Sequence, residues 1–425
     1  MVTEGCPKRS TIQLQRSSIW NYIEEEQRKY NGCAFGRVLD AGTGLHSLRW
    51  ISSLLVTSNT DSSSTLTTTT GGISSFIGIT ADQVMKRSVE KEAIKLGVPT
   101  VGNNNQNGKS STIKNEFLIG NWFVDKEKKK KHNDDTSTTN DVVDLTTYLL
   151  KGEGRRGELF DTIVADYLIG AMDAFSPFQQ DLMIETLTTL LKPGGRLYII
   201  GMEPIPDLLV HDAVNNGKET REQDGNIFCK VTRIRDAIVK LATDAKNSQQ
   251  RPYREYPMGW VQRMISQEKR LTEITATQLY LKYRHQNIVN QINVGRGKLK
   301  YIPTNKNSPT TTNSTRNAME LLLNELEIES KEITDQARGQ MVSVGNGFDY
   351  IIVAERLSQY QEWKLNLIDD KHSDALFFLL ILNVGLLVYF VSQQLKNYHN
   401  SSRRRDNNEK GAANHKKNRN KKKKS

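Results

Sequence analysis

The 425-residue sequence has few cysteines, and they form no recognisable group. Cys6, Cys33 and Cys229 are the only three, and their spacing matches neither a metal site nor a disulfide framework. A chain without such a framework is typical of a reducing compartment. The first 22 residues carry scattered charges and no apolar core, so we expect no cleavable secretory signal.

Most of the chain also lacks an excess of charge of either sign. The formal net charge is +11, but residues 396–425 hold twelve Lys and Arg against Asp406 and Glu409, a net +10. The remaining residues therefore carry a net charge of about +1. A broad basic surface of the kind that binds nucleic acid is not supported, and we expect no nucleic-acid partner.

The most informative segment is RVLDAGTG, residues 37–44. A short apolar strand ends on Asp40, and Gly42 and Gly44 follow just before a helix-like run over residues 47–56. Glycines in a turn between a strand and a helix let a ligand approach the backbone closely. The dinucleotide fingerprint requires a third glycine, at which this chain has Ser47, so that class of ligand is disfavoured.

Asp40-Ala41-Gly42-Thr43-Gly44 resembles the first motif of the class I S-adenosylmethionine-dependent methyltransferases, with His46 in place of that family's third glycine. Residues 191–201, LKPGGRLYIIG, resemble the family's late motif, in which Pro-Gly-Gly stops a helix and a strand begins at once. The late motif is the more specific of the two because its order and distance after a buried strand at 160–167 also fit. The resemblance spans about residues 31–357 and identifies no acceptor subfamily.

The resemblance implies an α/β fold: a Rossmann-like, doubly wound sheet of seven strands with an antiparallel final strand. Strands are predicted at residues 37–40, 75–80, 116–121, 160–167, 191–201, 271–280 and 348–354. Helices are predicted at residues 11–30, 47–56, 81–96, 171–191, 259–266 and 317–326. The first helix is expected either to pack on the domain or to cover its cofactor pocket.

The predicted organisation along the chain has several further parts. Residues 1–30 are an N-terminal helical segment, and the methyltransferase-like domain covers 31–357. Four stretches within it, poor in apolar residues, are predicted to be solvated insertions: 57–72, 101–115, 125–141 and 303–315. Residues 358–374 are predicted to be a linker.

Residues 375–395 contain no charged side chain, and the sequence predicts a transmembrane helix there. The basic tail at 396–425 is then expected to hold anionic lipid headgroups. The positive-inside rule would keep this tail cytosolic and send the large domain across the membrane. Because the cofactor is made in the cytosol and no signal peptide is visible, we expect a single C-terminal span with the catalytic domain facing the cytosol.

By the resemblance, the chain is an enzyme that moves a methyl group from S-adenosylmethionine to a small, apolar or lipid-like acceptor. Holding donor and acceptor in line supplies most of the catalysis of such a displacement. A general base is needed only where the acceptor must lose a proton early. No Ser/His/Asp constellation is therefore required, none is evident, and no metal ligands are expected.

The candidate site residues follow from the strand ends at which open α/β sheets bind ligands. The expected cofactor-binding residues are Asp40, Gly42, Thr43, Gly44, Thr80, Asn121 and Asp166. The candidate catalytic residues are Asp166, Tyr167 and Glu203, and Asp173 is also expected to face the pocket. Family members commonly have an acid where this chain has Thr80, and a hydroxyl binds a ribose less strongly than a carboxylate does.

Two other functions stay open at this point. His46 and Thr80 depart from the family pattern, which leaves room for a non-catalytic membrane adaptor with a degenerate methyltransferase fold. An aminopropyl transferase would share the sheet but would show an acidic pair that is not found. Residues 166–168, DYL, do not match the Asn/Asp-Pro-Pro-Tyr motif of enzymes that methylate adenine or glutamine, which argues against those substrates.

Overall fold

The computed structural model of the chain describes residues 18–31, 34–55, 72–81, 83–98, 115–120, 122–123, 145–151, 158–205, 219–243, 254–302, 309–336, 341–369 and 381–396. The chain forms two compact units, residues 1–358 and residues 359–425. The predicted insertions at 57–72, 101–115 and 125–141 lie outside the described residues, apart from Gly72 and Asn115 at their ends.

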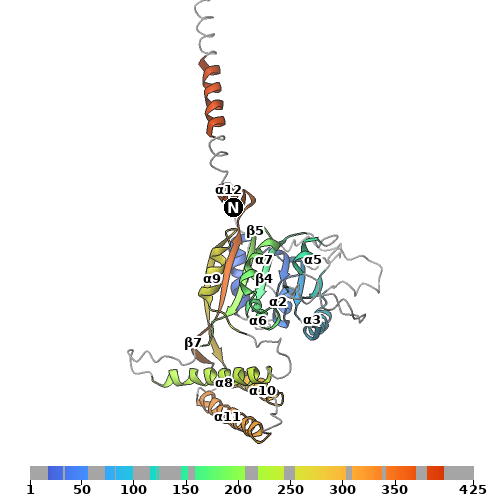
Figure 1. The fold of residues 1–425 in the computed structure, drawn as a ribbon, viewed down its shortest axis with the longest axis vertical. Helices are drawn as coiled ribbons and strands as arrows, with labels where there is room; N and C mark the ends of the chain where they lie inside the picture. Colours follow the sequence, from blue (N-terminus) through green and yellow to red (C-terminus); the bar gives the residue numbers. More distant parts are fainter. Residues whose placement is uncertain are drawn as a thin grey trace, which may run out of the picture. The chain divides into compact units, whose positions relative to one another are not determined.

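The first unit contains one seven-stranded sheet with the order β3-β2-β1-β4-β5-β7-β6 (Figure 1). Its strands are β1 (Gly36–Asp40), β2 (Ile73–Thr80), β3 (Glu116–Ile119), β4 (Phe160–Asp166), β5 (Leu191–Met202), β6 (Leu271–Tyr283) and β7 (Val342–Arg356). The first five strands are parallel, and β7 pairs antiparallel with both β5 and β6. The predicted Rossmann-like sheet with an antiparallel final strand is confirmed.

Helices cover both faces of this sheet, which is what a doubly wound fold requires. They are α1 (Ser18–Asn31), α2 (Leu45–Leu54), α3 (Gln83–Lys95), α5 (Leu145–Lys151), α6 (Leu168–Phe175), the 3-10 turn η2 (Gln180–Leu182), α7 (Met183–Leu190) and α9 (Met258–Gln267). Successive side chains along each strand enter opposite cores, as the period of two dictates. Val38 packs with α1, α2 and α3, whereas Leu39 packs with α5, α6, α7 and α9.

The helix α1 belongs to the packing of one sheet face. The indole of Trp20 stacks on that of Trp50 with ring centroids 4.7 Å apart. The buried Tyr198 hydroxyl of β5 donates to Oε1 of Gln27 over 2.6 Å. The aromatic stack and this buried hydrogen bond make α1 a packing helix, the first of the two roles considered for it.

The single helix predicted over 171–191 is interrupted. The helix α6 ends at Phe175, and a new helix, α7, begins only at Met183. Pro177 lies in the break, where its ring and its missing N–H prevent helix continuation.

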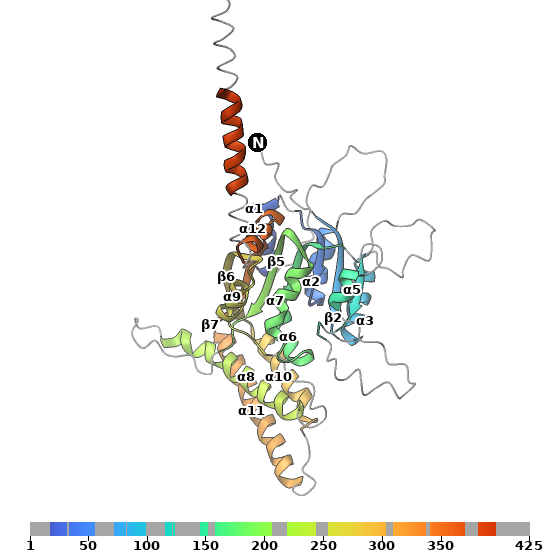
Figure 2. The same ribbon diagram turned by 45° about the horizontal axis from the view of Figure 1, so that its top comes forward.

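Three further helices form a layer of their own: α8 (Glu219–Thr243), α10 (His285–Leu299) and α11 (Pro309–Gln336). They lie side by side beyond the ends of the strands (Figures 1 and 2) and enclose a third core that includes Ile238, Ile292 and Leu323. Tyr283, the last residue of β6, joins this core, so the layer lies at the carboxyl edge of the sheet. The sequence predicted only part of α11, which begins inside the expected insertion at 303–315.

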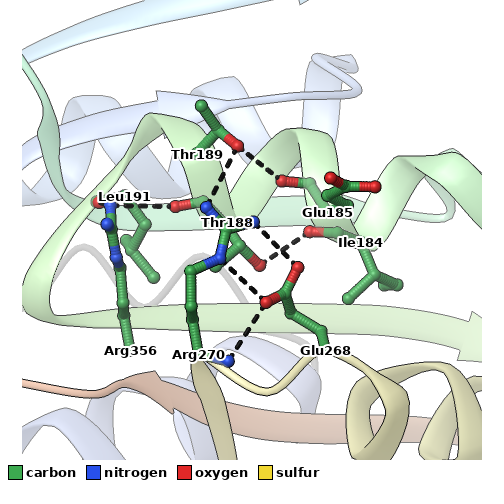
Figure 3. A network of polar contacts seen from close by, with 8 residues as sticks. All are labelled: Ile184, Glu185, Thr188, Thr189, Leu191, Glu268, Arg270 and Arg356. Atoms are coloured by element: carbon green, nitrogen blue, oxygen red, sulfur yellow. Dashed lines mark hydrogen bonds and ion pairs between the residues drawn. The ribbon is translucent and has the colours of Figure 1, made fainter. Parts of the chain in front are cut away.

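The opposite edge of the sheet is tied together by two arginines (Figure 3). The Arg356 guanidinium at the end of β7 donates to the carbonyl oxygens of Thr188 (3.2 Å) and Leu191. These carbonyls lie at the end of α7, where a helix leaves acceptors without a partner. Arg270 forms an ion pair with Glu268 at 2.8 Å. Burial alone would raise the pKa of Glu268, but the hydrogen bonds and charge of Arg270 outweigh it and lower that pKa.

The second unit corrects the prediction for the C-terminal region. The helix α12 (Gln359–Asp369) occupies part of the expected linker, and a further helix covers residues 381–396. Across the described ranges, no helix is both long and apolar enough to cross a membrane. The predicted transmembrane helix at 375–395, and the membrane location that rested on it, are therefore wrong.

Candidate active site

The glycine turn after β1 is fixed between its two neighbouring strands. The amide of Ala41 donates to the carbonyl of Val164 in β4, and the amide of Thr43 donates to that of Ile79 in β2, both over 2.8 Å. The Thr43 hydroxyl donates back to the carbonyl of Asp40 over 3.0 Å. The turn therefore has little freedom to change its shape.

Gly42 is required because the turn lies directly against β4. A Cβ atom added at Gly42 would lie 2.9 Å from the carbonyl oxygen of Asp166, closer than side chains approach in folded proteins. At Gly44, just before α2, no atom of the described residues lies within 4 Å of an added Cβ. The second glycine thus leaves its backbone open to the cavity that it lines.

That cavity has a volume of about 270 Å³ and lies at the carboxyl ends of β1, β2 and β4. One wall is the helix α6, from which Leu168, Ala171, Met172 and Phe175 line the cavity. These positions share one helical face at intervals of three and four residues. The remaining lining comes from the glycine turn, the ends of β2 and β4, one residue of α3, two residues after β3 and one after α6: Ala41, Gly42, Thr43, Gly44, Ile79, Thr80, Ala81, Met85, Gly120, Trp122, Asp166, Tyr167 and Ser176.

Two carboxylates next to the turn carry unusual electrostatics. Asp40 is fully buried, and neither side-chain oxygen has a hydrogen-bond partner among the described residues. Burial raises the pKa of Asp40 to about 7, although the hydroxyls of Ser47 and Thr43 and the Gly42 amide lie near enough to oppose the rise. Burial raises the pKa of Asp166 to about 8, and the negative charges of Asp40 and Asp349 add to that effect. A cation bound beside Asp40 and Asp166 would favour the ionised form of both groups and lower their pKa values.

Tyr167 connects the cavity to a third carboxylate. Its backbone is in the left-handed region, with φ of 49°, and the residue lines the cavity directly after Asp166. Its hydroxyl bonds to Asp349 of β7. Burial raises the pKa of Asp349 to about 6, against the opposing effect of that hydrogen bond.

The structure brings six predicted site residues together in the cavity lining: Gly42, Thr43, Gly44, Thr80, Asp166 and Tyr167. Asp40 lies behind the turn and does not reach the cavity surface. Asn121 lies outside the described residues. His46 is exposed on α2 and does not line the cavity, so it does not obstruct the turn.

Two other candidates have structural partners away from the cavity. Glu203 accepts a hydrogen bond from the amide of Met258 over 2.8 Å, at the first residue of α9. Asp173 is buried on α6 and accepts from the Gln180 side chain over 3.2 Å. Neither side chain lines the cavity, so the expectations for these two residues gain no support from the geometry.

The sequence analysis missed Trp122 and the cavity-lining face of α6. The Trp122 indole is buried, lines the cavity and donates to the carbonyl of Ala41 over 3.2 Å. Its place directly after the third strand was the one available signal. The apolar face of α6 could not be told apart from a core-facing stripe by its spacing alone.

No family model and no curated protein matches the chain. Similar folds do occur among solved structures. A putative methyltransferase from Bacillus halodurans is 10% identical, with coverage of 80% of this chain and 100% of that one and a TM-score of 0.36. The cyclopropane synthase MmaA2 from Mycobacterium tuberculosis is 12% identical, with coverage of 83% and 90% and a TM-score of 0.36.

A third similar structure is the mycolic acid cyclopropane synthase CmaA1, solved as a complex with SAH and CTAB. It is 12% identical, with coverage of 83% of this chain and 88% of that one and a TM-score of 0.38. At such values these likenesses say nothing of this chain's activity or ligands. The strand order, with β7 inserted antiparallel between β5 and β6, is the independent evidence. The chain has the fold of the class I S-adenosylmethionine-dependent methyltransferases, and the resemblance seen in its sequence is confirmed at the level of the fold.

Proposed function

We propose that the chain is an enzyme that transfers a methyl group from S-adenosylmethionine to a small acceptor with an apolar body. The observation that carries this proposal is the cavity against the glycine turn, with Asp166 in its lining and Asp40 behind the turn, neither paired with a Lys or Arg among the described residues. S-adenosylmethionine carries both a sulfonium and an ammonium group. Its cationic part therefore suits the side of the cavity next to Asp166 and Asp40.

The other lining residues also fit such a cofactor. Gly42 and Gly44 provide close backbone approach at the N-terminus of α2. Thr80 at the end of β2 would hold the ribose, and Trp122 offers an apolar indole for the adenine. When bound, the cofactor supplies an electrophilic methyl group on its sulfonium.

The residues of the chain would then bind the cofactor, orient the acceptor and accept its proton. The apolar wall of α6 would help to keep water from the reacting groups once cofactor and acceptor are bound, which would strengthen the electrostatic interactions between them. Asp166 is the candidate general base, because the cationic part of a bound cofactor would hold this buried carboxylate in its ionised form, which can accept a proton from the acceptor. Tyr167, held by Asp349, would orient the acceptor.

The character of the lining supports an uncharged, apolar acceptor. Among the described residues that line the cavity none is Lys or Arg, and five are Met, Leu, Ile or Phe side chains: Ile79, Met85, Leu168, Met172 and Phe175. A site for an anionic or nucleic-acid substrate would need basic side chains for its phosphates.

Calorimetric titration of the full chain with S-adenosylmethionine tests the proposal. The matched variants are Gly42→Val and Gly297→Val, since a Cβ at Gly297 on α10 meets no atom within 4 Å in the part of the chain that the structure describes. We expect binding to the wild type and to Gly297→Val, and none to Gly42→Val, with all three folded by circular dichroism. Absence of binding to the wild type, or unchanged affinity in a folded Gly42→Val, would overturn the assignment.

A further inference from the structure

Two residues other than glycine have a left-handed backbone in the described part of the chain, and both flank the helix α6. Tyr167 precedes the helix with φ of 49°, and Phe178 follows it with φ of 66°. Such a conformation is unfavourable for a bulky L-residue and is found mainly at functional sites. Tyr167 already lines the cavity. Phe178 is the more unusual of the two, because 79% of it is exposed to solvent.

Phe178 is one part of an exposed apolar rim at the cavity. We use the term apolar rim for Val84, Met85 and Phe178, which are 74%, 39% and 79% exposed. The rim is continuous with the cavity, because Met85 lines it from α3 and because Ser176, two residues before Phe178, lines it from the other side. Large apolar side chains that stay exposed next to a pocket mark a binding surface.

The volume of the cavity indicates that a second bound molecule would lie at the apolar rim. At about 270 Å³ it lies just below the range of about 300–1,000 Å³ that is usual for pockets that bury a whole small ligand. A single bound cofactor would therefore fill most of it. The body of a second molecule would have to lie outside, across the residues at the mouth.

We propose that the apolar rim binds the body of the methyl acceptor, and that the acceptor is an elongated, uncharged molecule with an alkyl chain. Its reacting end reaches the cavity beside Asp166, and its chain lies across Val84 and Phe178. None of the described residues that line the cavity is Lys or Arg, so no basic side chain there would pair with an anionic end group. This inference rests on the proposed function, since it assigns the acceptor side of the same site.

The test uses three probes with the same alkyl chain and different end groups: 1-octanol is neutral, octanoate is negative and octylamine is positive. The full chain is first saturated with S-adenosylhomocysteine, and each probe is then titrated in by calorimetry. We expect 1-octanol to bind, and octanoate to bind at least tenfold more weakly. Equal binding of octanoate, or tighter binding of octylamine than of 1-octanol, would overturn the assignment of an uncharged acceptor.

Three serine variants locate the site. Val84→Ser and Phe178→Ser should each lower the affinity for 1-octanol by about fivefold or more, because each removes an apolar contact with the chain. Ile94→Ser is the matched control, since Ile94 is 59% exposed at the far end of the same helix α3, and it should leave the affinity unchanged. Circular dichroism shows that each variant is folded.

The outcomes separate this inference from the proposed function. If the wild type binds S-adenosylhomocysteine but no octyl probe, or if the rim variants bind 1-octanol as the wild type does, the apolar rim is not the acceptor surface and the proposed function stands. If S-adenosylhomocysteine does not bind at all, both proposals fall.

Discussion

Replacing Asp40 by asparagine should make the protein more stable and a weaker binder of S-adenosylmethionine. The carboxylate is fully buried, and neither oxygen has a hydrogen-bond partner in the described part of the chain. Ionising it inside the fold is therefore unfavourable. Asparagine has nearly the same shape and never ionises, so the variant keeps the packing and loses the charge.

The size of the expected change in stability follows from the pKa of Asp40 in the folded and in the unfolded chain. The pKa of Asp40 is about 7 in the folded protein and about 3.9 in an unfolded chain. Below about pH 4 the group is protonated in both states and has no effect on stability. As the pH rises to about 7, ionisation of the unfolded chain destabilises the fold, by about 1.5 kcal/mol at pH 5 and by about 4 kcal/mol above pH 7.

Urea unfolding of the wild type and of Asp40→Asn, at about pH 5 and about pH 8, measures this effect. We expect the variant to gain more stability at the higher pH, by about 2 to 3 kcal/mol. Asp173→Asn is the control, since Asp173 is buried but accepts a hydrogen bond from Gln180, and it should show no such gain. A variant that is less stable than the wild type at both pH values would refute the reasoning, because Asp40 would then have a partner that stabilises its charge.

Three other perturbations should behave as follows. Affinity for S-adenosylmethionine should rise with pH between about 6 and 9, because the pKa of Asp166 is about 8 and only its ionised form attracts a cation; calorimetry that finds a flat profile would contradict this. Arg356→Met should lower the free energy of unfolding by about 2 kcal/mol, because the carbonyls of Thr188 and Leu191 lose a charged donor; a loss below about 0.5 kcal/mol in urea unfolding would show that water replaces it. Phe178→Gly should be about 1 kcal/mol more stable than Phe178→Ala, since only glycine adopts φ of 66° freely; the reverse order would mean that the backbone is not strained.

Much of the sheet could be predicted from local sequence. Buried parallel strands are short apolar runs, and VLD, FIGIT and FDTIVAD each end on a polar residue at the edge where the site lies. The Pro-Gly-Gly segment and the final strand fixed the order of the later elements, because few other folds combine them. The turn residues Gly42, Thr43 and Gly44 could also be predicted, because a pair of glycines directly after a strand is visible in the sequence and indicates an accessible backbone.

What could not be predicted depends on contacts between segments far apart in the chain. Asp349 reaches the site only because β7 lies antiparallel beside β5, and Glu203 turns away from it to accept from Met258. The helices α8, α10 and α11 bury their apolar residues against one another and against Tyr283 of β6, and polar flanks concealed their periodicity. The stretch at 375–395 was predicted to span a membrane because it has no charged side chain, but no helix in the described part of the chain is both long and apolar enough to do so.

Photolabelling with radioactive S-adenosylmethionine tests the central claim most directly, since ultraviolet light couples a bound cofactor to the aromatic side chains next to it. The account predicts that digestion of the labelled full chain yields label on the peptides that contain Trp122 or Tyr167, two of the three aromatic residues in the described lining of the cavity. Excess unlabelled S-adenosylhomocysteine should remove that label. Label confined to peptides from α8, α10 or α11, or label that the competitor does not displace, would contradict the account.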